Sequence, residues 1–489
     1  MKRFFYTLHA WGGILLSALF LMWFVSGIVM IYHGYPRWTD AEALRYSPPI
    51  DHSKLPSPDS LAHLLNKYSV DTTTHYSLQL ESNLMGETFF RVTTPEKEAS
   101  IRIEGDTLST PNVNYGYLQT LASRWQSDIL RVDTLHAVDQ WTPFSRLKED
   151  LPFYRIILND GEVGRWLYVS SRTGRILSES TSEERLWAYF GAIPHWIYPT
   201  ILRQDADLWK QVVIVLSGLG SIMVLAGCYA GIDRYVSTRK QRNKRTWQTP
   251  YKKSLYRWHH ILGTVSGLFI FAWVFSGMMS VVDIPEWLSG VPKDKPRITL
   301  NGTPPPPHTW TEDYRNILHR FPEAKRITWD SFADSPLMRM EGEDTAIVWD
   351  VREKAPLNLS METVVSVAQK AYKMSPATTT ELTEYDSYYI DRRRKLSLPV
   401  YRLVFDDDYD TALYVNPATA EVRTVDRRSR LSMWTYKKLH TMAFSFLVQS
   451  PTVWTIVMWI LLLAGTVVSL TGLILGIKFV QRKWKRFHS

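Results

Sequence analysis

The chain has 489 residues, of which 45% are hydrophobic, and a formal net charge of +9 at pH 7. Its mean hydropathy of −0.18 excludes a protein that lies wholly within a membrane and predicts a few spans together with large polar domains. The single cysteine, Cys228, excludes intrachain disulfides and cysteine-ligated iron–sulfur clusters.

Four apolar stretches are long enough to cross about 30 Å of hydrocarbon. The predicted transmembrane helices occupy residues 1–33, 209–232, 259–282 and 453–477. The first is longer than the apolar region of a signal peptide, and no small-x-small cleavage site follows it. We therefore expect it to be retained as a helix.

Basic residues gather on one side of these spans. Lys2 and Arg3 open the chain, the 233–258 connection carries nine Lys and Arg residues, and the 478–489 tail carries five. The positive-inside rule predicts that both termini and this connection are cytoplasmic. This placement accounts for most of the net charge, so no nucleic-acid partner is expected.

Two long polar segments, 34–208 and 283–452, are predicted to be exported domains. They share sequence: Leu-Pro-Phe-Tyr-Arg at 151–155 resembles Leu-Pro-Val-Tyr-Arg at 398–402. Alternating apolar and polar residues around these motifs predict antiparallel strands, and a helical pattern precedes the strands in each copy. Each domain is therefore predicted to be α+β.

The spans repeat as well as the domains. Residues 220–227 align with residues 465–472 at an offset of 245, and the same offset places His195 on His440. The order of span, exported domain and span thus occurs twice, which indicates an internal tandem duplication. The two halves have parallel topology, so a pseudo-twofold axis along the membrane normal is expected.

Four of the thirteen histidines keep a histidine partner in the repeat: His9 with His259, and His195 with His440. Imidazole is a standard axial ligand of haem iron. Pairing across the pseudo-twofold axis predicts an inner haem on His9 and His259 and an outer haem on His195 and His440. Two redox centres at two depths would let electrons cross the hydrocarbon in steps from one centre to the other.

Small residues accompany the inner histidines. At about 100° per residue, Gly13 and Gly27 lie within roughly 40° of His9 on one helix face. Gly263 and Gly277 repeat this spacing in the second half. A histidine on the same helix face as a row of glycines indicates a binding site for a flat ligand.

Several alternatives remain open. His33 could replace an outer ligand, and His260 adjoins His259 but points about 100° away from it. The four histidines could also be ordinary interfacial polar residues. Zinc is less favoured, because no third or fourth ligand clusters with either pair. The basic run at 391–395 is either a plain hairpin tip or an attractor of an anionic chelate.

The stretch LPVYRLVFDD…TALYVNPATAEV resembles a PepSY domain, and LPFYRIILNDG…RWLYVSSRTGRI resembles a more diverged one. The H-x-W-x-G pattern at 9–13 and the residues 438–441 resemble PepSY-associated transmembrane proteins. The resemblance implies two PepSY-like periplasmic domains, at 34–208 and 283–452, on a four-helix bundle in the bacterial inner membrane.

Members of this family include ferrisiderophore reductases that hold two b-type haems. The resemblance implies an oxidoreductase that passes electrons outward to iron in a ferric siderophore or another ferric chelate. His195 follows Ile193-Pro194 where His440 follows Lys438-Leu439, which makes His195 the less secure ligand. The chain has no G-x-G-x-x-G nucleotide motif, so the electron donor is expected to be a quinol or a separate cytoplasmic protein.

A different function is also compatible with these features. The exported domains contain no duplicated carboxylate pair and no nucleophile motif. The chain could instead be a membrane-anchored PepSY module that regulates or chaperones a periplasmic protease, without redox activity.

Overall fold

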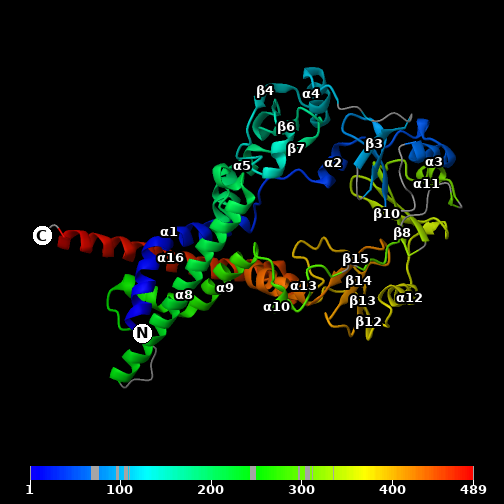
Figure 1. Ribbon diagram of the computed structural model, residues 1–489. Coiled ribbons are helices and arrows are strands. Elements are labelled where there is room, and N and C mark those ends of the chain that lie inside the picture. Colours follow the sequence, from blue (N-terminus) through cyan, green and yellow to red (C-terminus); the bar gives the residue numbers. More distant parts are fainter. Residues whose placement is uncertain are drawn as a thin grey trace.

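The computed structural model places a helical bundle beside three β-sheets (Figure 1). The residues that it describes are 2–67, 76–94, 98–103, 108, 111–242, 249–295, 298–302, 309–310, 312–333 and 335–487.

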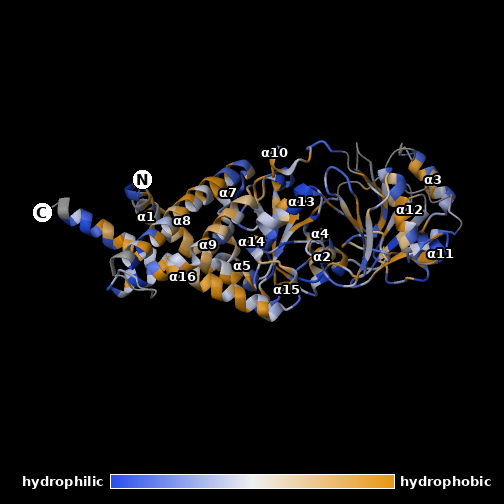
Figure 2. Ribbon diagram, turned by 90° about the horizontal axis from the view of Figure 1, so that it is seen from below, coloured by the Kyte–Doolittle hydropathy of each residue, from blue (hydrophilic) through white to orange (hydrophobic). Residues whose placement is uncertain are grey.

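Four helices are long and apolar enough to cross a membrane, as the sequence predicted. They are α1 (Lys2–Met30), α8 (Ala206–Arg242), α9 (Ser254–Met279) and α16 (Pro451–Phe487). Apolar residues cover them along most of their length (Figure 2). Between 17 and 33% of each apolar window is buried within the protein, so most of this surface needs an apolar solvent.

Two of these helices extend well beyond their predicted ends. Helix α8 continues from the predicted boundary at 232 to Arg242, and α16 runs through the predicted tail to Phe487. Lys and Arg are good helix formers and are favourable near a helix C-terminus, which explains the continuation. The basic segments are therefore largely helical.

The start of α1 and the C-terminal ends of α8 and α16 lie at one end of the bundle, and the sheets lie at the other (Figure 1). We call these the basic end and the sheet end. At the basic end, Lys2 forms a 2.6 Å ion pair with Asp233, and Arg482 donates a 3.1 Å hydrogen bond to the Tyr256 hydroxyl. These contacts tie α1 to α8 and α9 to α16.

A seven-stranded sheet joins the two halves of the chain. Its strand order is β11-β10-β9-β8-β1-β2-β3, and β1 pairs antiparallel with β8. The first half supplies β1 (Ser77–Ser82), β2 (Thr88–Thr93) and β3 (Glu98–Arg102). The second half supplies β8 (Arg326–Phe332), β9 (Ser335–Glu341), β10 (Ala346–Asp350) and β11 (Ala355–Pro356). Sequence alone did not predict this shared sheet.

Each half also has a four-stranded antiparallel sheet with its strands in sequence order. The first contains β4 (Ile129–Leu135), β5 (Phe153–Leu158), β6 (Trp166–Ser170) and β7 (Ile176–Ser180). The second contains β12 (Thr378–Leu382), β13 (Val400–Val404), β14 (Ala412–Val415) and β15 (Val422–Val425). Helices α4 (Tyr115–Ala122) and α12 (Met361–Tyr372) precede them, which confirms the predicted α+β composition.

The two four-stranded sheets carry the same buried polar contact. The Tyr168 hydroxyl donates to Asp139 at 2.7 Å, and the Tyr414 hydroxyl donates to Asp386 at 2.8 Å. Burial raises the pKa of both tyrosines, so each hydroxyl stays protonated and continues to donate. The repeated contact indicates that the two sheets are built on the same internal pattern.

Short helices connect each four-stranded sheet to the membrane helix that follows it. In the first half these are α5 (Ser182–Phe190), α6 (Ala192–Trp196) and α7 (Thr200–Arg203). In the second half they are α13 (Arg427–Ser432), the π-helical turn η6 (Met433–Lys438), α14 (Leu439–Thr441) and α15 (Ser445–Val448). The outer pair of histidines lies on α6 and α14.

The remaining helical segments lie in the loops. They are α2 (Asp40–Tyr46), η1 (His52–Lys54), α3 (Pro58–Lys67), η2 (Ser123–Trp125), η3 (Ser145–Asp150), η4 (Gly161–Val163), α10 (Glu286–Ser289) and α11 (Tyr314–Leu318).

Candidate functional site

The structure brings His9 of α1 and His259 of α9 next to each other within the bundle. Their ring centres are 6.1 Å apart, and their planes are inclined by 30°. A cavity of about 350 Å³ opens at this pair, lined mainly by apolar side chains and by glycines of all four membrane helices. The predicted inner pair is thus adjacent in space.

The orientation of the inner rings is fixed by their Nδ1 atoms. Nδ1 of His9 lies 3.3 Å from the Met223 carbonyl oxygen, and Nδ1 of His259 lies 3.0 Å from the Thr471 hydroxyl. The carbonyl can only accept, and the Thr471 hydroxyl already donates to its own helix at Val467. Nδ1 therefore carries the proton in both rings, which leaves Nε2 with a free lone pair.

The outer pair has the same design at the sheet end. The ring centres of His195 and His440 are 6.0 Å apart, with planes inclined by 60°. Nδ1 of His195 donates to the Trp23 carbonyl at 3.1 Å, and Nδ1 of His440 donates to the Trp273 carbonyl at 3.2 Å. A cavity of about 450 Å³ opens at this pair. Again Nε2 is the nitrogen left free to coordinate.

Serine hydroxyls reinforce this arrangement in the outer pair. Ser26 and Ser276 each lie 3.2 Å from the Nδ1 of the histidine on their side. Both hydroxyls donate to carbonyls of their own helix, so they can accept from the imidazole. Ser26 and Ser276 occupy equivalent positions in the repeat, as Trp23 and Trp273 do.

A glycine packs against each of the four imidazoles. A Cβ atom at Gly227 would lie 2.6 Å from the His9 ring, and one at Gly472 would lie 3.2 Å from His259. Cβ atoms at Gly27 and Gly277 would lie 3.4 Å from His195 and His440, respectively. Side chains at these positions would push on the rings, so the glycines help to set the ring positions.

The glycine face predicted around His9 therefore serves both sites. Gly13 and Gly263 line the inner cavity, and a Cβ at Gly13 would meet nothing within 4 Å. Gly27 and Gly277 instead contact the outer histidines. Gly13 and Gly263 leave room in the inner cavity, whereas Gly27 and Gly277 let the outer imidazoles pack closely against their helices.

The separation of the rings tests whether a haem fits. A metal–imidazole nitrogen bond is about 2.0–2.1 Å long, and a ring centre lies about 1.1 Å from its nitrogen, so two axial ligands of one metal have ring centres about 6.3 Å apart. The observed 6.1 and 6.0 Å are close to this value. Two histidines do not complete a zinc site, and the described residues contain no group of three metal ligands. A macrocycle supplies the missing equatorial ligands, so the residues fit a haem.

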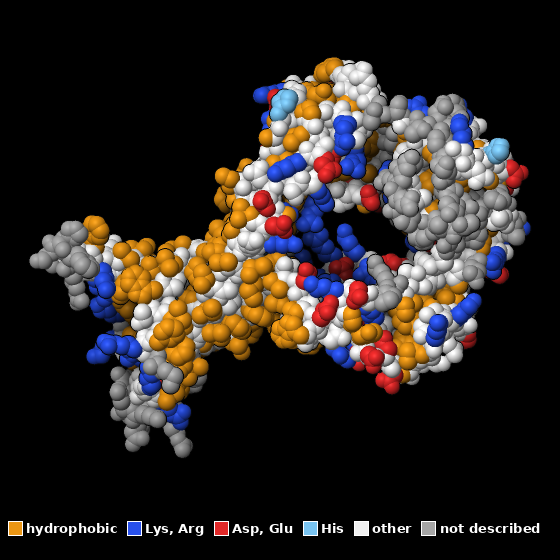
Figure 3. Space-filling view, viewed as in Figure 1, with side chains coloured by type: hydrophobic (Ala, Val, Ile, Leu, Met, Phe, Trp, Pro, Cys, Tyr) orange, Lys and Arg blue, Asp and Glu red, His pale blue; other side chains and the backbone are white. Residues whose placement is uncertain are grey.

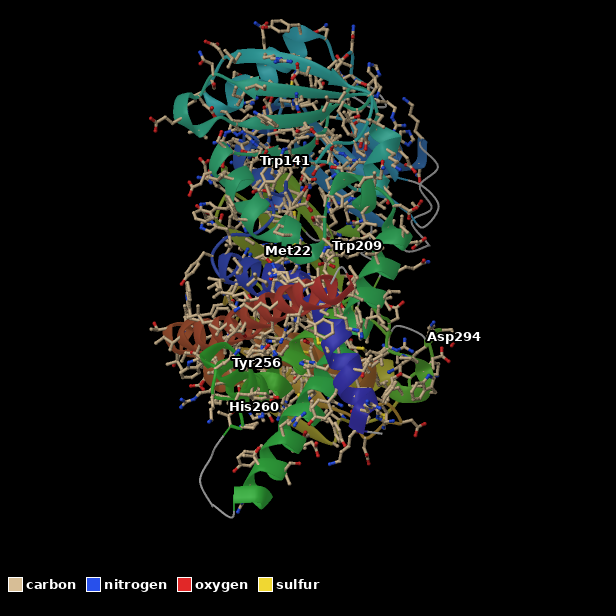
Figure 4. All side chains as sticks on the ribbon, turned by 90° about the vertical axis from the view of Figure 1, so that its left-hand side faces the viewer. Met22, Trp141, Trp209, Tyr256, His260 and Asp294 are labelled. Carbon is tan, nitrogen blue, oxygen red and sulfur yellow. The ribbon has the colours of Figure 1, made fainter. Side chains whose placement is uncertain are left out.

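The two alternative ligands differ in their position. The His33 ring stacks on Trp187, with ring centres 4.4 Å apart and planes inclined by 7°, and it borders neither cavity. His260 borders the inner cavity, where its Nε2 lies 3.0 Å from the Gly231 carbonyl of α8 and its Nδ1 is buried without a hydrogen-bond partner among the described residues. Tyr256 and His260 lie one turn apart near the start of α9 (Figure 4). His260 therefore stays an alternative ligand at the inner cavity, whereas His33 does not border the outer one.

Polar residues at the mouths of the cavities were not predicted as site residues. Tyr6 and Tyr256 border the inner cavity. They are equivalent at the offset of 250, so the comparison of repeats could have found them. Arg37 borders the outer cavity, but its repeat position holds Trp287. Comparison of the repeats could not have found Arg37.

If His9 and His259 hold a haem, replacing Thr471 with valine is expected to raise the midpoint potential of that haem and to leave a haem at the outer pair unchanged. Loss of the acceptor makes the His259 imidazole a poorer donor to iron, which disfavours the ferric state. Redox titration followed at the b-type absorption band would measure this. Thr466→Val is the matched control, because the Thr466 hydroxyl bonds only to Leu462 of its own helix. Equal shifts in both variants would contradict the assigned role of Thr471.

The fold defines a multi-pass membrane protein with two pairs of neighbouring histidines at its helical bundle. The family model for the PepSY-associated TM region matches residues 6–316, which is more than half of the chain. The chain belongs to this family of PepSY-associated transmembrane proteins, as its sequence motifs indicated. No curated protein matches the chain significantly.

Proposed function

We propose that the protein is a di-haem electron carrier of the bacterial inner membrane that reduces ferric iron in a chelate on the periplasmic side. The observation that carries this proposal is the repeated geometry of the histidine pairs. Both pairs have the ring separation of axial ligands, both direct Nδ1 to an acceptor, and both open to a cavity.

His9 and His259 would hold the inner b-type haem, and His195 and His440 the outer one. When bound, the two haems would supply one-electron carriers at two depths of the bilayer. The chain's own residues orient the imidazoles through their Nδ1 hydrogen bonds and surround each site with apolar side chains. A low dielectric and fixed ligands are the means by which a protein tunes such a centre.

The charge distribution supports the direction of transfer. The basic end of the bundle carries Lys2, Arg234 and Arg482, and the positive-inside rule places such an end in the cytoplasm. Electrons would then enter from a quinol or a cytoplasmic protein and leave at the sheet end. Ferrous iron binds the hard oxygen ligands of a siderophore more weakly than ferric iron does. The reduction would therefore release iron from the chelate.

The proposal predicts that protein purified from haem-replete cells contains about two b-type haems per chain. The measurement is a reduced-minus-oxidised absorption spectrum together with a pyridine haemochrome assay of the same sample. A Soret band with two separable midpoint potentials would support the proposal. Well-folded protein with no Soret band would overturn it.

The alternative is a membrane-anchored PepSY module that acts on a periplasmic protease without redox activity. It predicts no dependence of ferric reduction on the four histidines. Deleting the gene and measuring ferric-chelate reduction by intact cells separates the two functions. A rate of ferric-chelate reduction equal to that of the parent strain would favour the PepSY module without redox activity.

A further inference from the structure

Three arginines border the outer cavity. Arg37 comes from the segment that follows α1, and Arg392 and Arg393 come from the loop between β12 and β13. Both halves of the chain therefore contribute a cation to the same cavity as His195 and His440. The inner cavity has arginines too, but they belong to the basic ends of α8 and α16.

Asp391 attracts the neighbouring Arg392 electrostatically but forms no ion pair with it. Among the described residues, no carboxylate forms an ion pair with any of the three arginines. Their neighbours are aromatic: Arg37 lies 5.8 Å from the centre of the Trp196 ring, and Arg392 lies 4.4 Å from that of Trp454. Aromatic faces hold a guanidinium in place without neutralising its charge.

Arg37 and Arg393 are exposed to solvent, whereas Arg392 is partly buried. Burial together with the neighbouring Arg393 lowers the pKa of Arg392. Elsewhere in the same sheet, Arg402 is paired with Asp386 at 3.2 Å. The contrast indicates that the cluster at the cavity is arranged for an anion that comes from outside this set of residues.

The surface around this region carries both signs of charge. Figure 3 shows a hollow between the bundle and the sheets, with Lys and Arg side chains gathered on one side of it and Asp and Glu side chains also on its rim. An anion in the hollow would meet basic side chains on that side.

We propose that Arg37, Arg392 and Arg393 form a carboxylate-binding site at the mouth of the outer cavity. The planar guanidinium group matches a carboxylate in a two-bond fork, which a lysine cannot reproduce. Two carboxylates could occupy the site: the propionates of the outer haem, and the carboxylates of an anionic ferric chelate. If the bound carboxylates are haem propionates, this inference rests on the proposed function. If they belong to a ferric chelate, it does not require a haem.

The first arm of the test addresses the propionates. The triple variant Arg37→Ala, Arg392→Ala, Arg393→Ala is compared with Arg394→Ala, Lys395→Ala, which removes charge from the same loop. Arg394 donates to the Gln449 carbonyl, and neither control residue borders the outer cavity. If propionates occupy the site, the triple variant loses outer haem or lowers its midpoint potential, because removing cations favours the ferric state. The control should match the wild type.

The second arm addresses the chelate and does not depend on haem. Gallium(III) citrate is anionic and not reducible, so binding is measured without turnover, by tryptophan fluorescence of the detergent-solubilised protein. We expect the triple variant to bind it about ten-fold more weakly or worse, since charge-assisted bonds are lost. A positively charged gallium(III) trihydroxamate complex should show no such loss. The difference should shrink as salt is added.

The outcomes of the two arms are separable. A changed outer haem with unchanged citrate binding assigns the site to propionates, and the reverse assigns it to the chelate. If wild-type protein holds no haem but binds gallium citrate through these arginines, the proposed function fails and the carboxylate site remains. If the triple variant is produced at wild-type levels and matches the control in both arms, the inference is wrong.

Discussion

If the protein holds two haems as proposed, replacing His259 with alanine is expected to abolish the low-spin signal of one haem and to leave the other intact. His259 contributes the only described imidazole facing His9, and its ring centre is 6.1 Å from that of His9. Alanine cannot ligate, so the inner iron would lose an axial ligand or the haem would dissociate. We expect about half of the low-spin b-type absorbance to remain and ferric reduction to fall at least roughly ten-fold.

The measurement is an absorption and electron paramagnetic resonance spectrum of the purified variant, normalised to protein. His33→Ala serves as the control, because that imidazole stacks on Trp187 and faces neither cavity. It should retain two haems and full activity. Two unaltered low-spin haems in the His259 variant would refute the pairing of His9 with His259.

Replacing Gly227 with alanine is expected to weaken the binding of the proposed inner haem, although neither His9 nor His259 is changed. The new methyl group would lie 2.6 Å from the His9 ring, so the imidazole must tilt or move away. The His9 imidazole is held by the carbonyl of Met223, which lies on α8 like Gly227. Displacing a ligand that is oriented in this way lowers the affinity for the haem roughly ten-fold or more. Haem retention after dilution and gel filtration would be measured for the two haems separately.

Gly218→Ala provides a closely matched control in the same helix. The nearest atom to its new methyl group is the Met278 sulfur at 3.8 Å, which is ordinary contact. Both substitutions gain about 0.5–1 kcal/mol of helix stability from the loss of a glycine, so this effect cancels in the comparison. Equal haem retention in the two variants would mean that Gly227 does not constrain His9.

Sequence predicted the parts of the molecule that have strong local signals. The four spans followed from length and apolarity, and the adjacency of His195 to His440 followed from the repeat. Ile193-Pro194 precedes His195 where Lys438-Leu439 precedes His440, and the two imidazoles still make equivalent hydrogen bonds to carbonyls. The helical turn of α6 in one half and the π-helical turn before α14 in the other reach the same geometry by different local structure.

Other features could not be predicted because they depend on contacts across the chain. The pairing of β1 with β8 joins residues such as Leu80 and Ile327, which have no local signal of partnership. Thr471 was missed because its repeat position holds Ala226. The backbone carbonyls that accept from His9, His195 and His440 leave no trace in the residue types, unlike the repeated serines Ser26 and Ser276.

The seven-stranded sheet imposes an order on biosynthesis. Strand β1 is an interior strand of the finished sheet, flanked by β2 and β8, and Glu81 of β1 forms a 3.1 Å ion pair with Arg326 of β8. During translation β1 exposes an open hydrogen-bonding edge until α8, α9 and then β8 have been made. An edge left open for that long can pair with other chains. Chains that contain β1 but not yet β8 are therefore expected to be the species most prone to aggregate.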